Sequence, residues 1–105
     1  MIHKSFLPYL PFVKELMRQY RVKTAFVFGS VLTEGFRSDS DVDLLINFMD
    51  YSNPLAVGQS IWDLEDALER LTSRKIDLIT EHSLKNPYFI EELNNKKQLI
   101  YESQT

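Results

Sequence analysis

Three short runs of strand-forming apolar residues limit what this chain can fold into. The runs are Thr24–Phe28, Val42–Phe48 and Ile76–Thr80. Amphipathic helical patterns lie around them, from Phe12 to Tyr20 and from Pro54 to Leu71, and Asn86 with Pro87 opens a last helix. Helical and strand-like segments that alternate in this way favour an α/β or α+β fold, a small sheet covered by helices. The pattern leaves strand order and direction open, and it predicts only a short extended tail at Leu99–Tyr101.

The composition is that of one globular domain, which we expect to span residues 1–105. A chain of 105 residues with 44% apolar residues buries about two thirds of its unfolded surface. The absence of cysteine excludes disulfides and thiolate metal sites. No apolar run approaches the length of a membrane span, and Pro8 and Pro11 interrupt the N-terminal apolar patch, so we expect a cytoplasmic protein without a signal peptide. Fifteen acidic residues against twelve basic ones argue against bulk binding to nucleic acid.

Three aspartates interrupt the apolar strand runs. Asp41 and Asp43 are two residues apart, so they point to the same side of their strand, and Asp77 lies in the next strand. If the two strands are neighbours, the three carboxylates converge. Two carboxylates about 5 Å apart repel each other by about 3 kcal/mol at an effective dielectric constant of about 20. A divalent cation would relieve this repulsion, and oxygen ligands of this kind select Mg²⁺ or Mn²⁺.

The spacing of these aspartates from a glycine turn makes the pattern specific. A D-x-D sequence alone often reflects turn chemistry at the start of a strand. Here Gly29 and Ser30 end the preceding strand, and ten residues separate Ser30 from Asp41. A glycine at a strand end lets the backbone approach a phosphate, and amides of a following helical turn can receive its charge.

These motifs resemble the minimal nucleotidyltransferases of the DNA polymerase beta superfamily. The resemblance rests on Phe28-Gly29-Ser30, on the run from Ser40 to Ile46, on Ile76-Asp77-Leu78 and on the C-terminal segments Lys85–Phe89 and Leu99–Glu102. It covers nearly the whole chain and implies a polymerase beta-like core with a mixed sheet. Members of the family often carry an Arg and a Gly shortly after the Ser, where this chain has Thr33 and Glu34. Arg37 could replace that Arg as the basic residue that contacts the phosphates, but the sequence does not align it with the family position.

The resemblance also implies an activity. In the family scheme Asp41, Asp43 and Asp77 are the catalytic residues and hold two Mg²⁺ ions, with Asp77 as the base, while Gly29 and Ser30 bind the nucleotide phosphates. An acceptor hydroxyl attacks the α-phosphorus of a nucleoside triphosphate and pyrophosphate leaves. Such proteins commonly act as antitoxins that transfer AMP from ATP to a tyrosine of a HEPN-type toxin, which would be the partner here.

Two other functions and several other residues stay open at this point. The chain could be a non-catalytic antitoxin that neutralises its partner by binding, or a nucleotidyltransferase for a small molecule, with a homo-oligomer supplying the acceptor pocket. We interpret His3 and His82 as surface residues. Trp62 and Tyr88 are predicted to be packing residues on helices, and the acidic residues between 63 and 69 form a solvated helix face.

Overall fold

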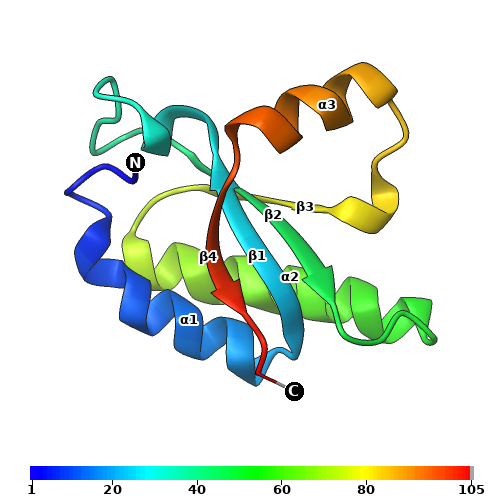
Figure 1. Cartoon of the computed structure of the whole chain (residues 1–105). Coiled ribbons are helices and arrows are strands. Elements are labelled where there is room, and N and C mark those ends of the chain that lie inside the picture. Colours follow the sequence, from blue (N-terminus) through cyan, green and yellow to red (C-terminus); the bar gives the residue numbers. More distant parts are fainter. Residues whose placement is uncertain (105) are drawn as a thin grey trace.

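The strand runs pair into one four-stranded mixed sheet. The computed structural model describes residues 1–104, and its strands are β1 (Val22–Phe28), β2 (Val42–Phe48), β3 (Ile76–Thr80) and β4 (Gln98–Glu102). Their order across the sheet is β3-β2-β1-β4 (Figure 1). The central strand β2 is antiparallel to β1 and parallel to β3, and β4 is antiparallel to β1. The predicted small mixed sheet with helical cover is confirmed.

The predicted extended tail is an edge strand of the sheet, and this strand, β4, is longer than the predicted segment. Its residues pair with β1, with Tyr101 opposite Ala25 and Leu99 opposite Phe26. The run is short and carries a charged residue at its end, so its own sequence pattern is weak. Its partner strand lies far away in the sequence, which is why the local pattern does not indicate the pairing.

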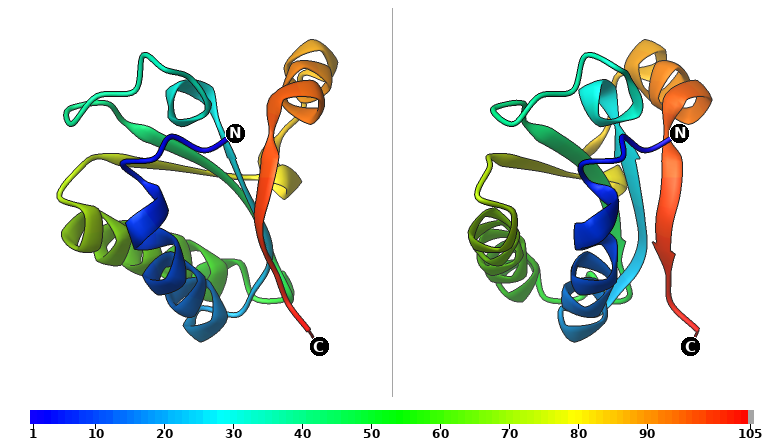
Figure 2. Two further views of the ribbon diagram at one scale, coloured as in Figure 1. Left: turned by 60° about the vertical axis from the view of Figure 1, so that its left-hand side comes forward. Right: turned by 90° about the vertical axis from the view of Figure 1, so that its left-hand side faces the viewer.

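Helices cover both sides of the sheet. They are α1 (Leu10–Gln19), α2 (Pro54–Thr72) and α3 (Pro87–Lys96), with short 3-10 turns η1 (Leu7–Tyr9), η2 (Gly29–Leu32) and η3 (Glu81–Ser83). Figure 2 shows α1 and α2 side by side on one face and α3 on the other. Asn53 and Asn86 cap α2 and α3, because each side chain accepts backbone N–H groups of the first turn.

The alternation of β2 separates a buried apolar face from a face that carries polar residues, called the polar face below. Val42, Leu44 and Ile46 are fully buried and pack in one core with Leu64 and Leu68 of α2. Asp43 and Asn47, which alternate with these buried residues along β2, point to the opposite face of the sheet. The helix α3 lies over part of that face. The fold therefore delivers the polar residues of β2 to a face where a ligand has access.

Not every aromatic residue packs as predicted. The side chains of Trp62 and Tyr88 are 74% and 83% exposed, so the prediction that they are packing residues is wrong. Phe12 on α1 is likewise exposed, although it belongs to the helical apolar pattern. Periodicity identifies the apolar positions of a helix but does not show which of them another element covers. Within residues 1–104 no helix combines the length and apolarity that crossing a bilayer requires.

Candidate active site

Two of the three predicted aspartates are direct neighbours in the sheet. Asp43 of β2 and Asp77 of β3 are register partners in the parallel pair (β2, β3), so their side chains lie on the same face. Burial raises the pKa of the Asp43 carboxyl, and the charge of Asp77, a hydrogen bond shared with Asp77 and the charge of Asp41 raise that pKa further. The neighbouring carboxyl groups thus disfavour a negative charge on Asp43, and a bound cation would relieve this repulsion.

Gly29 lies directly against the carboxyl group of Asp43. It follows β1 with a φ of +77°, a conformation that L residues with side chains rarely adopt. A Cβ atom built at Gly29 would lie 2.5 Å from Oδ2 of Asp43, far inside van der Waals contact. Only glycine fits here without moving the carboxyl group. The turn thus brings the backbone of Gly29 next to the Asp43 carboxyl group.

Ser30 connects the same turn to the segment that carries Asp41. Its hydroxyl donates to the backbone carbonyl of Asp41 over 3.4 Å, and its own carbonyl accepts the hydroxyl of Thr33 at 2.8 Å. Asp41 itself is exposed and precedes β2 by one residue. The structure thus groups Gly29, Ser30 and the three aspartates at one edge of the polar face, with Asp41 at its exposed rim.

Arg74 positions the loop before β2, and sequence reasoning missed it. Its Nη1 donates to the carbonyl of Arg37 at 2.9 Å and to the carbonyl of Ser40 at 2.8 Å. Its guanidinium also lies 4.3 Å from the centre of the Phe36 ring. The two carbonyls belong to the turn that leads into Asp41, so Arg74 fixes that turn. The side chain of Arg37 is exposed, and its backbone N–H donates to Ser40 Oγ.

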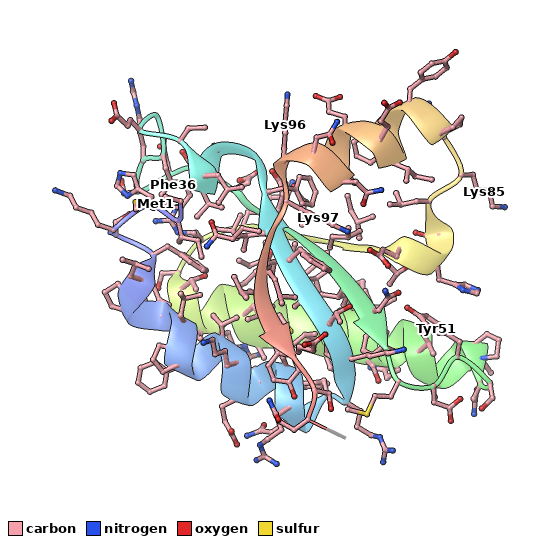
Figure 3. The ribbon with its side chains drawn as sticks, in the orientation of Figure 1. Met1, Phe36, Tyr51, Lys85, Lys96 and Lys97 are labelled. Carbon is pink, nitrogen blue, oxygen red and sulfur yellow. The ribbon has the colours of Figure 1, made fainter. Side chains whose placement is uncertain are left out.

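A second polar cluster occupies the same face further along β2. Glu81, directly after β3, forms an ion pair with Lys97 at 3.3 Å and accepts a hydrogen bond from the amide of Asn47. Lys97 also lies 4.1 Å from the centre of the Phe26 ring, between α3 and the sheet (Figure 3). Tyr51 donates to Asn47, and its ring stacks on His82 at 4.5 Å. His82 is exposed, as predicted, and its ring also stacks on the ring of Tyr51.

The donor set fits a hard divalent cation in part. Carboxylate oxygens are the ligands that Mg²⁺ prefers, and Mg²⁺ commonly takes only one or two protein carboxylates and completes its shell with water and substrate phosphates. Across residues 1–104, no group of three or more His, Asp or Glu side chains is gathered closely enough to hold a metal ion alone. Asp43 and Asp77 provide two such carboxylates on neighbouring strands.

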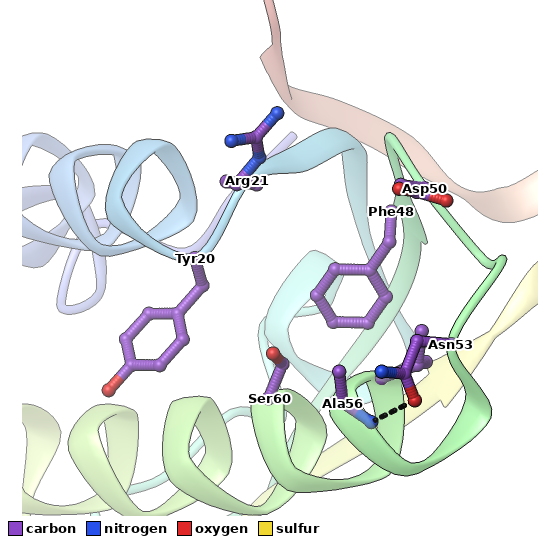
Figure 4. A pocket seen from close by; sticks show the side chains of 8 residues that line it. Tyr20, Arg21, Phe48, Asp50, Asn53, Ala56 and Ser60 are labelled. Atoms are coloured by element: carbon purple, nitrogen blue, oxygen red, sulfur yellow. Dashed lines mark hydrogen bonds between the residues drawn. The ribbon is translucent and has the colours of Figure 1, made fainter.

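The cavity shown in Figure 4 lies away from these residues. It has a volume of about 320 Å³ and is lined by Tyr20, Arg21, Phe48 and the start of α2. Phe48 is the last residue of β2, whereas Asp43 is the second, so the cavity lies at the other end of the strand. A cavity of about 240 Å³ between Leu45 and α3 lies closer, on the same face as Asp43. None of the predicted site residues lines either cavity.

Comparison with known proteins agrees with this geometry. Residues 12–105 match the family model described as polymerase beta, nucleotidyltransferase. The chain belongs to this nucleotidyltransferase family. A relative from Methanocaldococcus jannaschii, named as a candidate protein adenylyltransferase, is 39% identical over 88 residues, which are 84% of each chain.

Solved structures show the same fold. The chain matches a candidate minimal nucleotidyltransferase with a TM-score of 0.71 and 28% identity, over 93% of this chain and 95% of that one. It also matches a chain of the Shewanella oneidensis complex between a tri-AMPylated HEPN toxin and an MNT antitoxin, with a TM-score of 0.65 and 17% identity, over 93% of this chain and 73% of that one. The resemblance to minimal nucleotidyltransferases and the polymerase beta-like core are confirmed.

Proposed function

We propose that this chain, as one nucleotidyltransferase domain of residues 1–105, transfers AMP from ATP to a tyrosine of a HEPN-type toxin and so acts as a cytoplasmic antitoxin. The observation that carries the proposal is the pairing of Asp43 with Asp77 on neighbouring strands, with the Asp43 carboxyl group against Gly29. The relative named for protein adenylyltransferase activity supports AMP as the group transferred. The solved complex of an AMPylated HEPN toxin with its antitoxin supports the partner.

The family scheme gives each predicted site residue a role in this proposal. Asp41, Asp43 and Asp77 are the groups that would hold Mg²⁺, as two ions in the family scheme, and Gly29 and Ser30 would bind the phosphates. When bound, Mg²⁺ stabilises the negative charge on the attacking and leaving oxygens of an in-line displacement. The chain itself holds Asp43 and Asp77 on two adjacent strands and places the Asp43 carboxyl group against Gly29.

The reaction balances without a further reactant. The tyrosine oxygen forms a bond to the α-phosphorus of ATP, and the bond from that phosphorus to the bridging oxygen of pyrophosphate breaks. The tyrosine proton passes to the Asp77 carboxylate, which acts as the base. The products are AMP-tyrosine on the toxin and pyrophosphate, which leaves with the bridging oxygen.

The test uses ATP labelled at the α-phosphate and, separately, at the γ-phosphate. The purified chain is incubated with Mg²⁺, labelled ATP and the HEPN-type protein encoded next to its gene. We expect the α label on the toxin and the γ label in pyrophosphate, with a toxin mass increased by AMP. Asp43→Asn and Asp77→Asn should transfer no label.

The same variants distinguish the rival functions. If they still neutralise the toxin in stoichiometric amounts and the unaltered chain transfers no label, the chain is a binding antitoxin and the proposed transfer is wrong. If the label is found on a small hydroxyl compound and never on the toxin, the acceptor is wrong. Transfer to a toxin tyrosine that only the unaltered chain performs supports the proposal.

A further inference from the structure

The backbone on either side of Asp41 is bonded to the segment that leads into β3. Before Asp41, the carbonyl of Ser40 accepts a hydrogen bond from Nη1 of Arg74 at 2.8 Å. After it, the N–H of Val42 donates to the carbonyl of Lys75 at 3.0 Å. Both partners directly precede β3, the strand that carries the third predicted aspartate. The segment before β3 thus links the position of Asp41 to that strand.

Arg74 reaches across the whole turn of residues 37–40. Its Nη1 also donates to the carbonyl of Arg37 at 2.9 Å. The same carbonyl accepts the N–H of Ser40 at 3.1 Å, and the N–H of Arg37 donates to Ser40 Oγ at 2.9 Å. The first and last residues of the turn are therefore bonded to each other, and Arg74 binds both of them from outside. A turn closed in this way moves as one unit, and Arg74 determines where that unit lies.

The guanidinium group is itself held in place by aromatic packing. It lies 4.3 Å from the centre of the Phe36 ring, and Phe36 is only 4% exposed. The Phe36 ring packs edge to face on Phe6, with 6.4 Å between the ring centres. A planar guanidinium can stack on a ring while its edge donates hydrogen bonds, whereas the ammonium group of a lysine has no such plane. The contact with Phe36 therefore fixes the direction in which Arg74 donates.

The cationic group of Arg74 binds backbone and leaves the carboxylates free. Within residues 1–104 neither Arg74 nor Asp41 takes part in an ion pair. An arginine that paired with the carboxylate of Asp41 would compete with a metal ion for its oxygens. Because Arg74 donates to neutral carbonyl groups instead, it can hold the backbone before Asp41 without occupying that carboxylate.

We propose that Arg74 is a positioning residue of the nucleotidyltransferase site, which holds Asp41 at the edge of the polar face where the other two aspartates lie. The inference rests on the proposed function, because it concerns the carboxylates assigned there to Mg²⁺. Arg74 acts through the carbonyl groups of the turn and touches neither the metal nor the nucleotide. Replacing a residue that orients a metal ligand typically lowers metal affinity or activity by about 10–100-fold.

Binding of Mn²⁺ alone tests this role without ATP or toxin, because Mn²⁺ accepts the same oxygen ligands as Mg²⁺. The electron paramagnetic resonance signal of free Mn²⁺ measures the bound fraction. Arg74→Met should weaken Mn²⁺ binding at least about tenfold. The sign is diagnostic, because loss of a positive charge would by itself strengthen cation binding. Binding by Arg74→Met that is equal to or tighter than that of the unaltered chain overturns the proposal, as does an unaltered chain that binds no Mn²⁺.

Two further variants separate positioning from charge and from folding. Arg70→Met removes the same charge from the exposed surface of α2, where Arg70 pairs with Asp66 at 3.1 Å, and it should leave Mn²⁺ binding within about twofold. Arg74→Lys keeps the charge but lacks the planar group, so it should still weaken binding at least about threefold. Urea unfolding establishes that each variant is folded under the assay conditions. If Arg74→Met does not fold, Arg74→Lys decides, and binding equal to that of the unaltered chain would overturn the proposal.

The Mg²⁺ dependence of AMP transfer distinguishes positioning from a purely structural role. For Arg74→Met we expect the Mg²⁺ concentration of half-maximal transfer to rise by the same factor as the Mn²⁺ affinity falls. A purely structural role would lower the rate equally at every Mg²⁺ concentration, because it changes only the folded fraction, and this result would overturn the proposal. If the unaltered chain binds Mn²⁺ but transfers no AMP, the proposed function is wrong, and the Mn²⁺ titration still decides the role of Arg74.

Discussion

The polar face of the sheet carries two carboxylate clusters that differ in how their negative charge is compensated. In the first, Asp43 faces Asp77, and within residues 1–104 neither forms an ion pair with a Lys or Arg. In the second, Glu81 has both the ammonium group of Lys97 and the amide of Asn47. The chain therefore can place a cation on this face, and it does so only at the second cluster.

This difference separates a structural cluster from a functional one. A half-buried carboxylate costs free energy unless a partner compensates it. Glu81 obtains its partner from the chain, and the resulting contacts tie β3 to β2 and to the end of α3. Asp43 and Asp77 have no such cationic partner within residues 1–104, so a bound cation would have to compensate their charge. A perturbed carboxyl group without an internal partner is typical of a functional site.

Removing one charge from each cluster gives the largest contrast. We expect Asp43→Asn to lower nucleotide transfer at least about a thousandfold, because it removes a carboxylate from the reacting centre. Its free energy of unfolding should stay equal or rise, because the repulsion with Asp77 disappears. Glu81→Gln should show the reverse, with transfer kept within about tenfold and reduced stability. Transfer assays and urea unfolding check both variants, and equal transfer by both would contradict the distinction.

A methyl group at Gly29 tests how closely the first cluster depends on its backbone. In Gly29→Ala the new Cβ would collide with Asp43 Oδ2, and the positive φ would add strain of about 1–2 kcal/mol. A displaced carboxylate should lower transfer about a hundredfold. Gly35→Ala is the control, because its Cβ would have an ordinary contact of 3.6 Å with Thr33. If both variants keep full transfer, the position of Asp43 against Gly29 does not matter for activity.

Much of the first cluster could be predicted from the sequence, and almost none of the second. Asp41, Asp43 and Gly29 lie within a short stretch, where strand alternation and the end of an apolar run are visible. Placing Asp77 beside these residues requires one assumption, that the strand of Asp77 pairs with the strand of Asp43. The pair of Glu81 and Lys97 joins the end of one strand to the end of a helix, and no local pattern marks it.

The same reason explains the other residues that the sequence did not indicate. Arg74 contacts carbonyl groups more than thirty residues away, because β2 and β3 begin side by side. Trp62 is predicted to pack because it is an aromatic residue on a helix, but its exposure depends on which elements fold over α2. Local periodicity thus predicts the strands and helices, whereas contacts between distant segments need the folded chain.

Neighbouring lysines offer a matched test of the second cluster. Lys97→Met should lower the free energy of unfolding by about 2 kcal/mol, because it leaves the half-buried Glu81 without its cation and removes the contact with Phe26. Lys96 pairs with Glu92 on the surface and points away from the sheet (Figure 3). Lys96→Met should therefore cost no more than about 0.5 kcal/mol. Equal losses in urea unfolding would show that Lys97 does not compensate Glu81.

The smallest expected effect is the pH dependence of the metal-free protein. Because the pKa of Asp43 is raised in the folded state, folding favours its protonated form, and this contribution is present below the ordinary pKa of aspartate. It should be lost as the pH rises through the interval between the ordinary and the raised pKa, and Asp43→Asn should remove the loss. Asp50 is the control of opposite sign, because hydrogen bonds from Ser52 lower its pKa, so its contribution is lost as the pH falls. Thermal unfolding measured from acid to neutral pH should show opposite changes in slope for Asp43→Asn and Asp50→Asn, and the same slope in both would contradict an uncompensated charge at Asp43.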